Sequence, residues 1–562
     1  MQSIKVAHVF SEGIGLGPIY LVKEEAQVVA TYSVTTPQEV ERELERFRAA
    51  VAKTAAHLAV IAADNAIFAG HLEIVNDIAL HDSVFSKIRD EKLNAEQACS
   101  NAIEDFRMMF AMMDDAYMQQ RAADMVDIGS QLMAALQNRS DDRFADLKEA
   151  SVIIARDLYP SDTARLDLNN VLGFITEEGG STSHVSIMAK SLEIPALVGV
   201  KGILEAAAGA KRIALDASSG EVYLDPTDEI IAEFSAKQKR FCEEKRALLA
   251  AADEAVRTQD GKLIKCYANV GSIQDIRKAK DLRVDGVGLF RTEFLYMEND
   301  HFPTEAEQFE VYREAVQILG GEIIIRTLDI GGDKRLTYYD FLPEENPFLG
   351  LRAIRICLSK PEILLTQFRA ILRASAFGKL RIMIPMLSTL TEADRARELF
   401  EQAKDELRDE GVDFDRNIAF GMMMETPASV LMADEFAKDM DFFSIGTNDL
   451  TQYVLACDRG NKEIKDLYNP FDPAVLRSIK RIIDAGQHAG IEVGMCGEFA
   501  SNPLATKLLL GLGLDEFSMA ATSTLRVKAE LRAGDVTEYA KRAAAIIQSR
   551  TAADVVAELN NW

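Results

Sequence analysis

Eight apolar, β-prone runs alternate with amphipathic helical segments in the C-terminal part of the chain, and no other feature restricts the fold as strongly. The runs are IKCYANV (264–270), VDGVGLF (284–290), EIIIRTL (322–328), LRIMIPM (380–386), IAFGMMM (418–424), DFFSIGT (441–447), EVGMCG (492–497) and DEFSM (515–519). Strands that alternate with helices pair in parallel, because each helix carries the chain back across the sheet. Eight such units predict a (β/α)8 barrel, which places function at the C-terminal strand ends.

Polar residues concentrate where these runs end. They are Arg291, Arg326, Glu425, Asn448, Asp449 and Cys496. The C-terminal ends of barrel strands meet at one rim, so the pattern predicts that these side chains share a single site.

The arginines at this rim suit an anionic ligand. Arg291 follows VGLF, and Arg326 ends the next run. A guanidinium group is a planar fork that binds two oxygens at once, which fits phosphate or carboxylate, although structural ion pairs are the alternative for each arginine alone. Arg459 in CDRGN adds another cation, whereas Arg352 and Arg355 in NPFLGLRAIRI either extend the basic lining or pair on a helix surface.

Two carboxylates at the same rim point to a metal ion. Glu425 and Asp449 follow neighbouring runs. Mg²⁺ prefers oxygen ligands, with substrate phosphate completing its shell, and helix capping is the alternative role for each carboxylate. Asn448 can donate a hydrogen bond to an anionic oxygen, while the context of Cys496 alone indicates a buried, inert thiol.

The chain before the barrel is organised around a long helical stretch. Between Pro37 and Pro160 there is no proline, and apolar residues recur three and four positions apart, which predicts a bundle of several helices. β-prone runs flank this stretch, and a charged segment with an apolar stripe follows, which predicts a connector helix or, alternatively, a peripheral helix of a neighbouring domain. We expect a multidomain α/β protein with an α/β domain at 1–30 and 145–224, a helical bundle at 31–144, a connector helix at 225–254 and the barrel at 255–562.

His184 stands in a setting that suits a phosphoryl group. It follows the pair Gly179–Gly180 and the hydroxyl cluster 181–183, and an apolar-periodic helix begins there. Free N–H groups and the positive end of the dipole at a helix N-terminus bind anions, and a histidine nitrogen is nucleophilic near neutral pH. An isolated histidine at a helix start is usually a cap, but the glycines and hydroxyls favour catalysis here. The other histidines lack this setting: His8, His57, His71, His81, His301 and His488.

Charge and composition exclude several classes of protein. The formal net charge of −26 repels nucleic-acid phosphates and anionic lipid, so we expect no nucleic-acid partner. The six cysteines show no paired spacing, which predicts reduced thiols and a cytoplasmic location. No signal-peptide pattern and no apolar run of about 18 residues is present, so we expect no membrane insertion.

The segment GGSTSHVSIMAKSLEIPALVG (179–199) resembles the phosphohistidine signature of Enzyme I of the bacterial phosphoenolpyruvate:sugar phosphotransferase system. The resemblance extends over essentially the whole chain. It implies that phosphoenolpyruvate phosphorylates a histidine, that the small carrier protein HPr accepts the group while docked on the helical bundle, and that the protein is a homodimer through the barrel. This is the first step of sugar uptake.

The resemblance also implies roles residue by residue. His184 matches the histidine phosphorylated on Nε2, and Cys496 in GMCGE matches the proton donor to the enolate of pyruvate. Phosphoenolpyruvate-binding positions correspond to Arg291, Arg326, Asn448, Asp449 and Arg459, and the Mg²⁺ ligands to Glu425 and Asp449.

The sequence departs from the family pattern in two places. Ser181 stands where many relatives have a basic residue, and acidic residues are sparse around His71, which predicts weaker charge support for the phosphohistidine and weaker binding of the carrier.

A pyruvate phosphate dikinase-like enzyme needs an ATP-binding domain, but no G-x-x-x-x-G-K loop precedes His184. A nitrogen-regulatory paralogue needs an additional sensory domain, for which we find no room. A catalytically silent regulatory homologue is disfavoured by the intact site residues.

Overall fold

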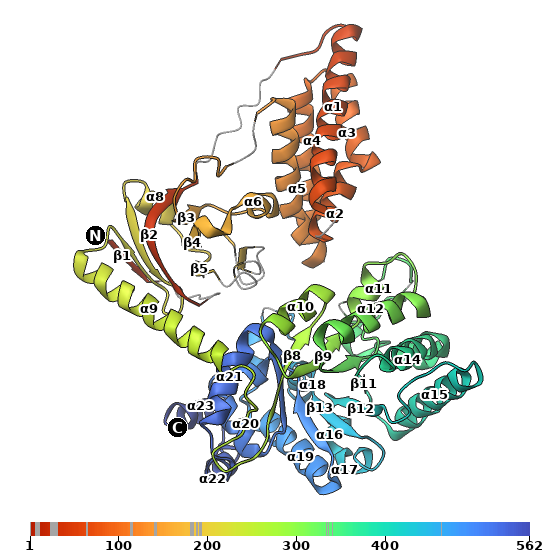
Figure 1. Ribbon diagram of the computed structural model, residues 1–562. Helices are drawn as coiled ribbons and strands as arrows, with labels where there is room; N and C mark the ends of the chain where they lie inside the picture. Colours follow the sequence, from red (N-terminus) through yellow and green to blue (C-terminus); the bar gives the residue numbers. More distant parts are fainter. Residues whose placement is uncertain are drawn as a thin grey trace. The chain divides into compact units, whose positions relative to one another are not determined.

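The structure is a computed structural model that describes residues 2–5, 12–22, 32–62, 66–112, 116–139, 143–179, 185–186, 189, 194–332, 334, 336–339, 341–461 and 463–562. The chain forms two compact units, Met1–Glu244 and Lys245–Trp562 (Figure 1). No helix within the described ranges is long and apolar enough to cross a lipid bilayer.

The first unit contains a seven-stranded sheet in the order β1-β7-β6-β2-β3-β4-β5. β2 pairs in parallel with β3, whereas β6 and β7 form an antiparallel pair. The strands are β1 (Gln2–Lys5), β2 (Ile14–Leu21), β3 (Ser151–Ala155), β4 (Val171–Thr176), β5 (Ala196–Leu197), β6 (Arg212–Asp216) and β7 (Glu221–Leu224), with the short helices α6 (Pro160–Arg165) and α8 (Ile203–Ala207).

Five helices lie between β2 and β3 in the chain and run side by side in Figure 1. They are α1 (Pro37–Ala62), α2 (Ala66–Val75), α3 (Ile78–Arg89), α4 (Ala95–Ala111) and α5 (Ala116–Leu136). Their shared core includes Leu44 and Phe47, which lie three positions apart on α1, and Leu132 of α5. The expected bundle is therefore present, and the proline-free sequence is what allows its long helices.

A continuous helix, α9 (Asp228–Ala250), follows the sheet. Phe234 is the buried residue of its apolar stripe and packs edge-on against Tyr223 of β7. Lys237, one turn later, lies over the ring of Phe234 and 3.7 Å from Glu221. These contacts fasten the N-terminal half of α9 to the sheet of the first unit.

The second unit is a closed barrel of parallel strands in the order β10-β11-β12-β13-β14-β15-β8-β9, which confirms the predicted (β/α)8 fold. Its strands coincide with the eight apolar runs: β8 (Lys265–Val270), β9 (Gly286–Arg291), β10 (Glu322–Arg326), β11 (Leu380–Ile384), β12 (Ala419–Met424), β13 (Phe442–Ile445), β14 (Glu492–Met495) and β15 (Glu516–Ala520). Every residue of β11 is buried, as expected of a strand covered on both faces.

Helices surround the barrel (Figure 1). The outer helices are α10 (Ile273–Asp281), α12 (Glu305–Leu319), α14 (Pro361–Ser375), α15 (Leu390–Asp409), α17 (Ala433–Phe436), α19 (Pro473–Ala489), α20 (Thr506–Leu512), α21 (Ala521–Arg532), α22 (Val536–Ile546) and α23 (Ala552–Asn560). The shorter helices α11 (Glu293–Met297), α16 (Pro427–Leu431) and α18 (Thr447–Val454) follow strands directly, whereas α13 (Ile354–Ser359) comes after the long loop that follows β10. Thr304 and Thr389 start α12 and α15 with capping boxes.

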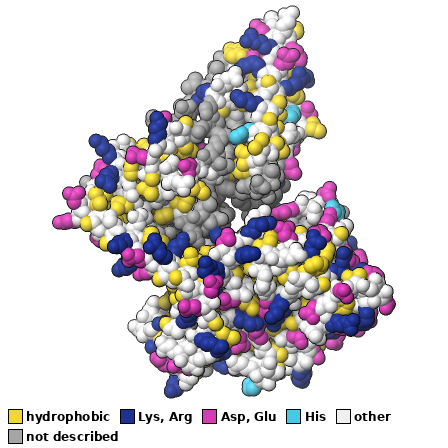
Figure 2. All heavy atoms as spheres, viewed as in Figure 1, with side chains coloured by type: hydrophobic (Ala, Val, Ile, Leu, Met, Phe, Trp, Pro, Cys, Tyr) yellow, Lys and Arg dark blue, Asp and Glu magenta, His cyan; other side chains and the backbone are white. Residues whose placement is uncertain are grey.

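The barrel interior has a small apolar layer of its own. Leu289, Ile324, Met383, Met423 and Phe442 form it together with Cys496. This layer fills the barrel beneath the C-terminal strand ends, so polar residues that follow the strands lie on a rigid, water-excluding floor. On the face drawn in Figure 2, basic and acidic side chains are intermixed over the barrel surface.

Candidate active site at the barrel mouth

A cavity of about 640 Å³ opens at the C-terminal ends of the barrel strands. Its lining includes all the predicted barrel residues, namely Arg291, Arg326, Glu425, Asn448, Asp449, Arg459 and Cys496. The β12–β13 ladder shows why they meet: Met424 pairs with Ile445, so the residues that follow these strands emerge side by side. The structure thus brings the predicted set together, while the role of each residue stays a prediction.

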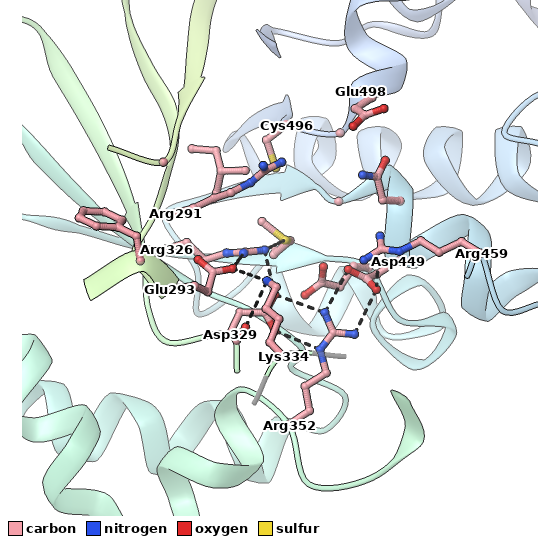
Figure 3. Close-up of a pocket in the computed structure, with 18 of the residues that line it drawn as sticks. Arg291, Glu293, Arg326, Asp329, Lys334, Arg352, Asp449, Arg459, Cys496 and Glu498 are labelled. Atoms are coloured by element: carbon pink, nitrogen blue, oxygen red, sulfur yellow. Dashed lines mark hydrogen bonds and ion pairs between the residues drawn. The ribbon is translucent and has the colours of Figure 1, made fainter. Parts of the chain in front are cut away.

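Arg326 anchors a buried ion-pair cluster on one side of the cavity (Figure 3). It is the last residue of β10 and only 6% exposed. Its guanidinium pairs with Glu293 and lies 3.0 Å from Asp329 Oδ2, and Lys334 Nζ lies 2.6 Å from Glu293 Oε1. Burial acts to raise the pKa of Asp329, but Arg326 and Arg352 outweigh it, so this carboxyl titrates below its usual value and stays ionised.

Arg352 joins the two acidic sides of the cavity. Its Nε donates to Asp329 Oδ1 at 3.0 Å, and its Nη1 and Nη2 donate to the two oxygens of Asp449 at 3.1 and 3.2 Å. Only 3% of Arg352 is exposed. Of the two roles predicted for Arg352 and Arg355, Arg352 therefore takes the first and extends the basic lining of the cavity. Arg355 donates to the carbonyls of Leu349 and Gly350 and is not part of the lining.

Glu425 has one satisfied and one unsatisfied carboxylate oxygen. Its Oε1 accepts a hydrogen bond from the backbone N–H of Met386 at 2.7 Å. Its Oε2 is buried and finds no partner among the described residues. Burial, and next the neighbouring charge of Asp449, raise the pKa of Glu425 to about 8. An unpaired buried carboxylate beside a second carboxylate is a place where a cation fits.

The described residues hold no cluster of three or more His, Cys, Asp or Glu side chains arranged for a metal ion. Glu425 and Asp449 alone therefore supply at most part of a coordination shell. Mg²⁺ usually keeps several waters and takes few protein carboxylates, with substrate phosphate as a further ligand, so two carboxylates are compatible with it.

Cys496 follows β14 and lies on the apolar floor of the cavity. It is 3% exposed, and burial raises the pKa of its thiol to about 11. The sulfur is therefore protonated at neutral pH. A thiol that keeps its proton is a poor nucleophile but is able to donate that proton to a stronger base.

The remaining predicted residues lie toward the opening. Arg291, at the end of β9, has an exposed side chain with no ion-pair partner in the described part of the chain. Arg459 Nη1 lies 4.0 Å from Asp449 Oδ1, and Asn448 is the second residue of α18. An unpaired guanidinium at the opening is available to an incoming anion.

His184 and Ser181 lie outside the described residues. What is described nearby is the end of β4, then Gly179 with φ +100°, and β5 further on. A positive φ at Gly179 fits the sharp turn expected after this strand. The structure therefore does not test the position of the predicted nucleophile.

Besides Glu498, which follows Cys496 by two positions, sequence reasoning missed three charged residues of the cavity, namely Glu293, Asp329 and Lys334. Each lies within the motifs RTEF or RTLDIGGDK, a few residues after the strand-end arginines. Charge at these offsets from a strand end was the available signal. With them the lining holds five basic side chains (Arg291, Arg326, Lys334, Arg352, Arg459) and five acidic ones (Glu293, Asp329, Glu425, Asp449, Glu498), so an anion is better accommodated together with a cation than alone.

Comparison with known proteins agrees with this geometry. Residues 245–536 match the PEP-binding domain of PEP-utilising enzymes, residues 147–220 their mobile domain and residues 7–121 their N-terminal region. The phosphoenolpyruvate-protein phosphotransferase of Haemophilus influenzae is 44% identical over 554 residues, covering 97% of this chain and 96% of the relative. That of Staphylococcus carnosus is 42% identical over 556 residues, with coverage of 97% and 96%.

A solution structure of the Enzyme I protein nEIt is 30% identical and covers 42% of this chain and 99% of that one, with a TM-score of 0.37. The full-length relatives carry the assignment without it, because their alignments span both units of the chain. The resemblance found in the sequence is confirmed, and the chain belongs to the phosphoenolpyruvate-protein phosphotransferase family of PEP-utilising enzymes.

Proposed function

We propose that the chain transfers the phosphoryl group of phosphoenolpyruvate to its own His184 and then to a histidine of the phosphocarrier HPr. One observation carries the first half-reaction: a single cavity combines a guanidinium and a buried carboxylate oxygen that have no partner among the described residues with a buried protonated thiol. Those groups suit, in turn, an anionic substrate, a divalent cation and a carbanion-like leaving group.

Binding of phosphoenolpyruvate uses the basic side chains around the cavity. Arg291 and Arg459 are placed to receive the phosphoryl and carboxylate oxygens at the opening, while Arg326 is already oriented by Glu293 and Asp329. Glu425 and Asp449 would hold a Mg²⁺ ion, which supplies positive charge to the phosphoryl oxygens when it is bound. Asn448 donates to a substrate oxygen.

Transfer breaks the P–O bond of phosphoenolpyruvate and forms a P–N bond to Nε2 of His184, and the enolate of pyruvate leaves. Cys496 then gives its S–H proton to the methylene carbon of the enolate, which becomes the methyl group of pyruvate. The resulting thiolate recovers a proton from water. The raised pKa of Cys496 keeps the thiol protonated until a base as strong as an enolate is present.

The second half-reaction passes the phosphoryl group from His184 to HPr docked on the helical bundle, which makes the cycle ping-pong. The groups that bind phosphoenolpyruvate lie in the second unit and His184 lies in the first. His184 has to reach the bound substrate in one step and docked HPr in the other, so the units change their mutual position between steps. A homodimer through the barrel and a cytoplasmic location remain part of the proposal. Sedimentation equilibrium tests the dimer.

Labelling with [³²P]phosphoenolpyruvate and Mg²⁺ tests the proposed function. We expect an acid-labile, base-stable label that His184→Ala abolishes and that added HPr removes from the original chain. His488→Ala is the matched control, because His488 is an exposed histidine at the end of α19. Label that persists in His184→Ala would refute the assignment.

The metal proposal has a separate test. Glu425→Gln keeps the shape of the side chain but removes the charge, so labelling should require a much higher Mg²⁺ concentration, about 100-fold by analogy with lost metal ligation. The measurement is the Mg²⁺ concentration that gives half-maximal labelling. An unchanged requirement would show that Glu425 is not a ligand.

A further inference from the structure

We infer that Asn269 and Ser518 are positioning residues that hold the backbone of Cys496, and so fix the direction from which its proton reaches the enolate; the inference rests on the proposed function of Cys496. Asn269 is the penultimate residue of β8, and Ser518 is in the middle of β15. Neither residue lines the cavity, so neither was expected from the chemistry of the substrate.

The strand ladder between β14 and β15 ends just before Cys496. β14 pairs with β15 through Gly494–Glu516 and Met495–Phe517, and the ladder goes no further. Cys496 lies beyond the last residue pair of this ladder. Its backbone carbonyl, at a buried site, requires another partner.

Asn269 provides that partner from a strand that is not adjacent to β14. In the barrel order β15 lies between β14 and β8. Asn269 pairs with Ala520 at the end of β15, and its side chain reaches back across that strand so that Nδ2 donates to the carbonyl of Cys496 at 2.8 Å. The side chain of Asn269 thus holds the carbonyl of Cys496 from outside the β14–β15 ladder.

Ser518 holds the other end of the side-chain amide of Asn269. Its hydroxyl donates to Asn269 Oδ1 at 2.6 Å, and Ser518 is fully buried. A hydroxyl can both donate and accept, whereas the carbonyl of Cys496 can only accept, so a flipped amide would still bond Ser518 but would set Oδ1 against that carbonyl. Asn269 Nδ2 therefore points at Cys496.

The backbone N–H of Cys496 is held as well. This N–H donates to the carbonyl of Ile445 at the end of β13, at 3.1 Å. With the N–H fixed by β13 and the carbonyl fixed by Asn269, the residue has little freedom to rotate. A proton donor held in this way approaches one face of a planar enolate, which predicts stereospecific protonation.

The test follows the configuration of the product methyl group. Phosphoenolpyruvate carrying deuterium stereospecifically at C3 is converted in tritiated water, and the pyruvate is trapped as lactate for chiral-methyl analysis. We expect one configuration from the original chain. Asn269→Asp, which keeps the shape but replaces the donor by an acceptor, should give a mixture of configurations and slow pyruvate formation about tenfold. The amplitude of His184 labelling and the KM for phosphoenolpyruvate should change little.

Ser518→Ala gives an independent variant, which should show the same mixture in weaker form because Asn269 Oδ1 then loses its donor and the side chain is held less firmly. Asn417→Asp is the matched control, an identical change at an exposed residue before β12. If Cys496→Ala loses the stereospecificity while both Asn269→Asp and Ser518→Ala keep it undiminished, the inference is overturned. If Cys496→Ala also retains it, the proposed role of Cys496 is wrong, and the inference is wrong with it.

Discussion

At the scale of single residues, Arg352 shows how one buried guanidinium can neutralise two carboxylates that line the cavity. Arg352 is almost completely buried between Asp329 and Asp449, and its Nη1 also donates to the hydroxyl of Tyr453 at 3.1 Å. Its neighbour Ala353 has φ 52°, a backbone conformation that non-glycine residues rarely adopt. The surrounding contacts therefore hold this turn in place.

We predict that Arg352→Met destabilises the barrel by about 3–5 kcal/mol, because it leaves two buried carboxylates without their counter-charge. Urea unfolding followed by circular dichroism measures the loss. Arg355→Met, three residues further on, removes a guanidinium that only donates to two loop carbonyls and should cost about 1 kcal/mol. Equal losses in the two variants would contradict the assignment of Arg352 as a buried bridge.

The sequence predicted the strand-end residues because their position depends only on where a strand stops. It left Arg352 between two alternatives and missed Asp329, because these residues belong to the loop after β10, whose path is not periodic. Pairing between Arg352 and Asp449 joins residues 97 positions apart. No local pattern reports such a contact.

At the scale of elements, the strands of the barrel begin in a second charged cluster, at the opposite end from the cavity. It consists of Lys265, Glu322, Arg381, Glu492 and Glu516. Lys265 and Arg381 each lie 2.6 Å from Glu492 and 3.4 Å from Glu322. Glu516 is buried, and its Oε1 has no hydrogen-bond partner in the described ranges.

Burial, followed by the charge of Glu492, raises the pKa of Glu516 to about 8 from 4.5. Between these values the folded chain binds more protons than the unfolded chain, so this carboxyl stabilises the fold at low pH and loses its contribution as pH rises toward 8. We predict that Glu516→Gln, which stays neutral, gains stability relative to the original chain between pH 5.5 and 8, on the order of 2–3 kcal/mol.

Urea midpoints at several pH values measure this difference. Glu401→Gln, at an exposed residue of α15, is the control and should show a constant offset. A parallel pH dependence for Glu516→Gln and the original chain would mean that Glu516 is ionised in the folded state.

The helix α21 fastens the chain that follows α9. Lys528 is buried, and its Nζ donates to the carbonyls of Ala252 and Arg283 and to Asp285 Oδ1, at 2.9, 3.2 and 2.6 Å. Arg532 Nη2 donates to the carbonyl of Ala251 at 2.9 Å. These bonds hold the segment 251–254 on the barrel, so this segment is an anchor of the second unit.

We predict that Lys528→Met releases this anchor, because three acceptors lose their donor. Hydrogen exchange of the amides in 251–254 should accelerate by about tenfold or more, which corresponds to the loss of roughly 1.4 kcal/mol of local stability. Lys541→Met on α22 makes the same change at an exposed residue and should leave these amides unaffected. Unchanged exchange in Lys528→Met would show that other contacts hold the segment.

At the scale of the whole molecule, the described residues that line the cavity all belong to the second unit, whereas the proposed nucleophile belongs to the first. Binding of phosphoenolpyruvate is therefore separable from phosphorylation. The His184→Ala chain cannot accept the phosphoryl group under the proposal, so its substrate binding can be measured at equilibrium.

In the His184→Ala background, calorimetric titration with phosphoenolpyruvate and Mg²⁺ should detect binding. Adding Arg326→Met should weaken it by about tenfold or more, because a charge-assisted contact is lost. Adding Arg313→Met, a half-buried arginine of α12 paired with Glu310 and outside the cavity lining, should change the Kd by less than about twofold. No binding in His184→Ala alone would show that the two units build the substrate site jointly.

The sequence by itself determined the multidomain α/β architecture, the eight barrel strands and the identity of the residues at their C-terminal ends. These features follow from hydrophobic periodicity and strand ends, which are local properties of the chain. Tertiary structure alone decided that Arg352 bridges Asp329 and Asp449, that one oxygen of Glu425 is unpaired and that Asn269 supports Cys496. Pairing and burial depend on distances between residues far apart in sequence, and those distances exist only once the barrel has closed.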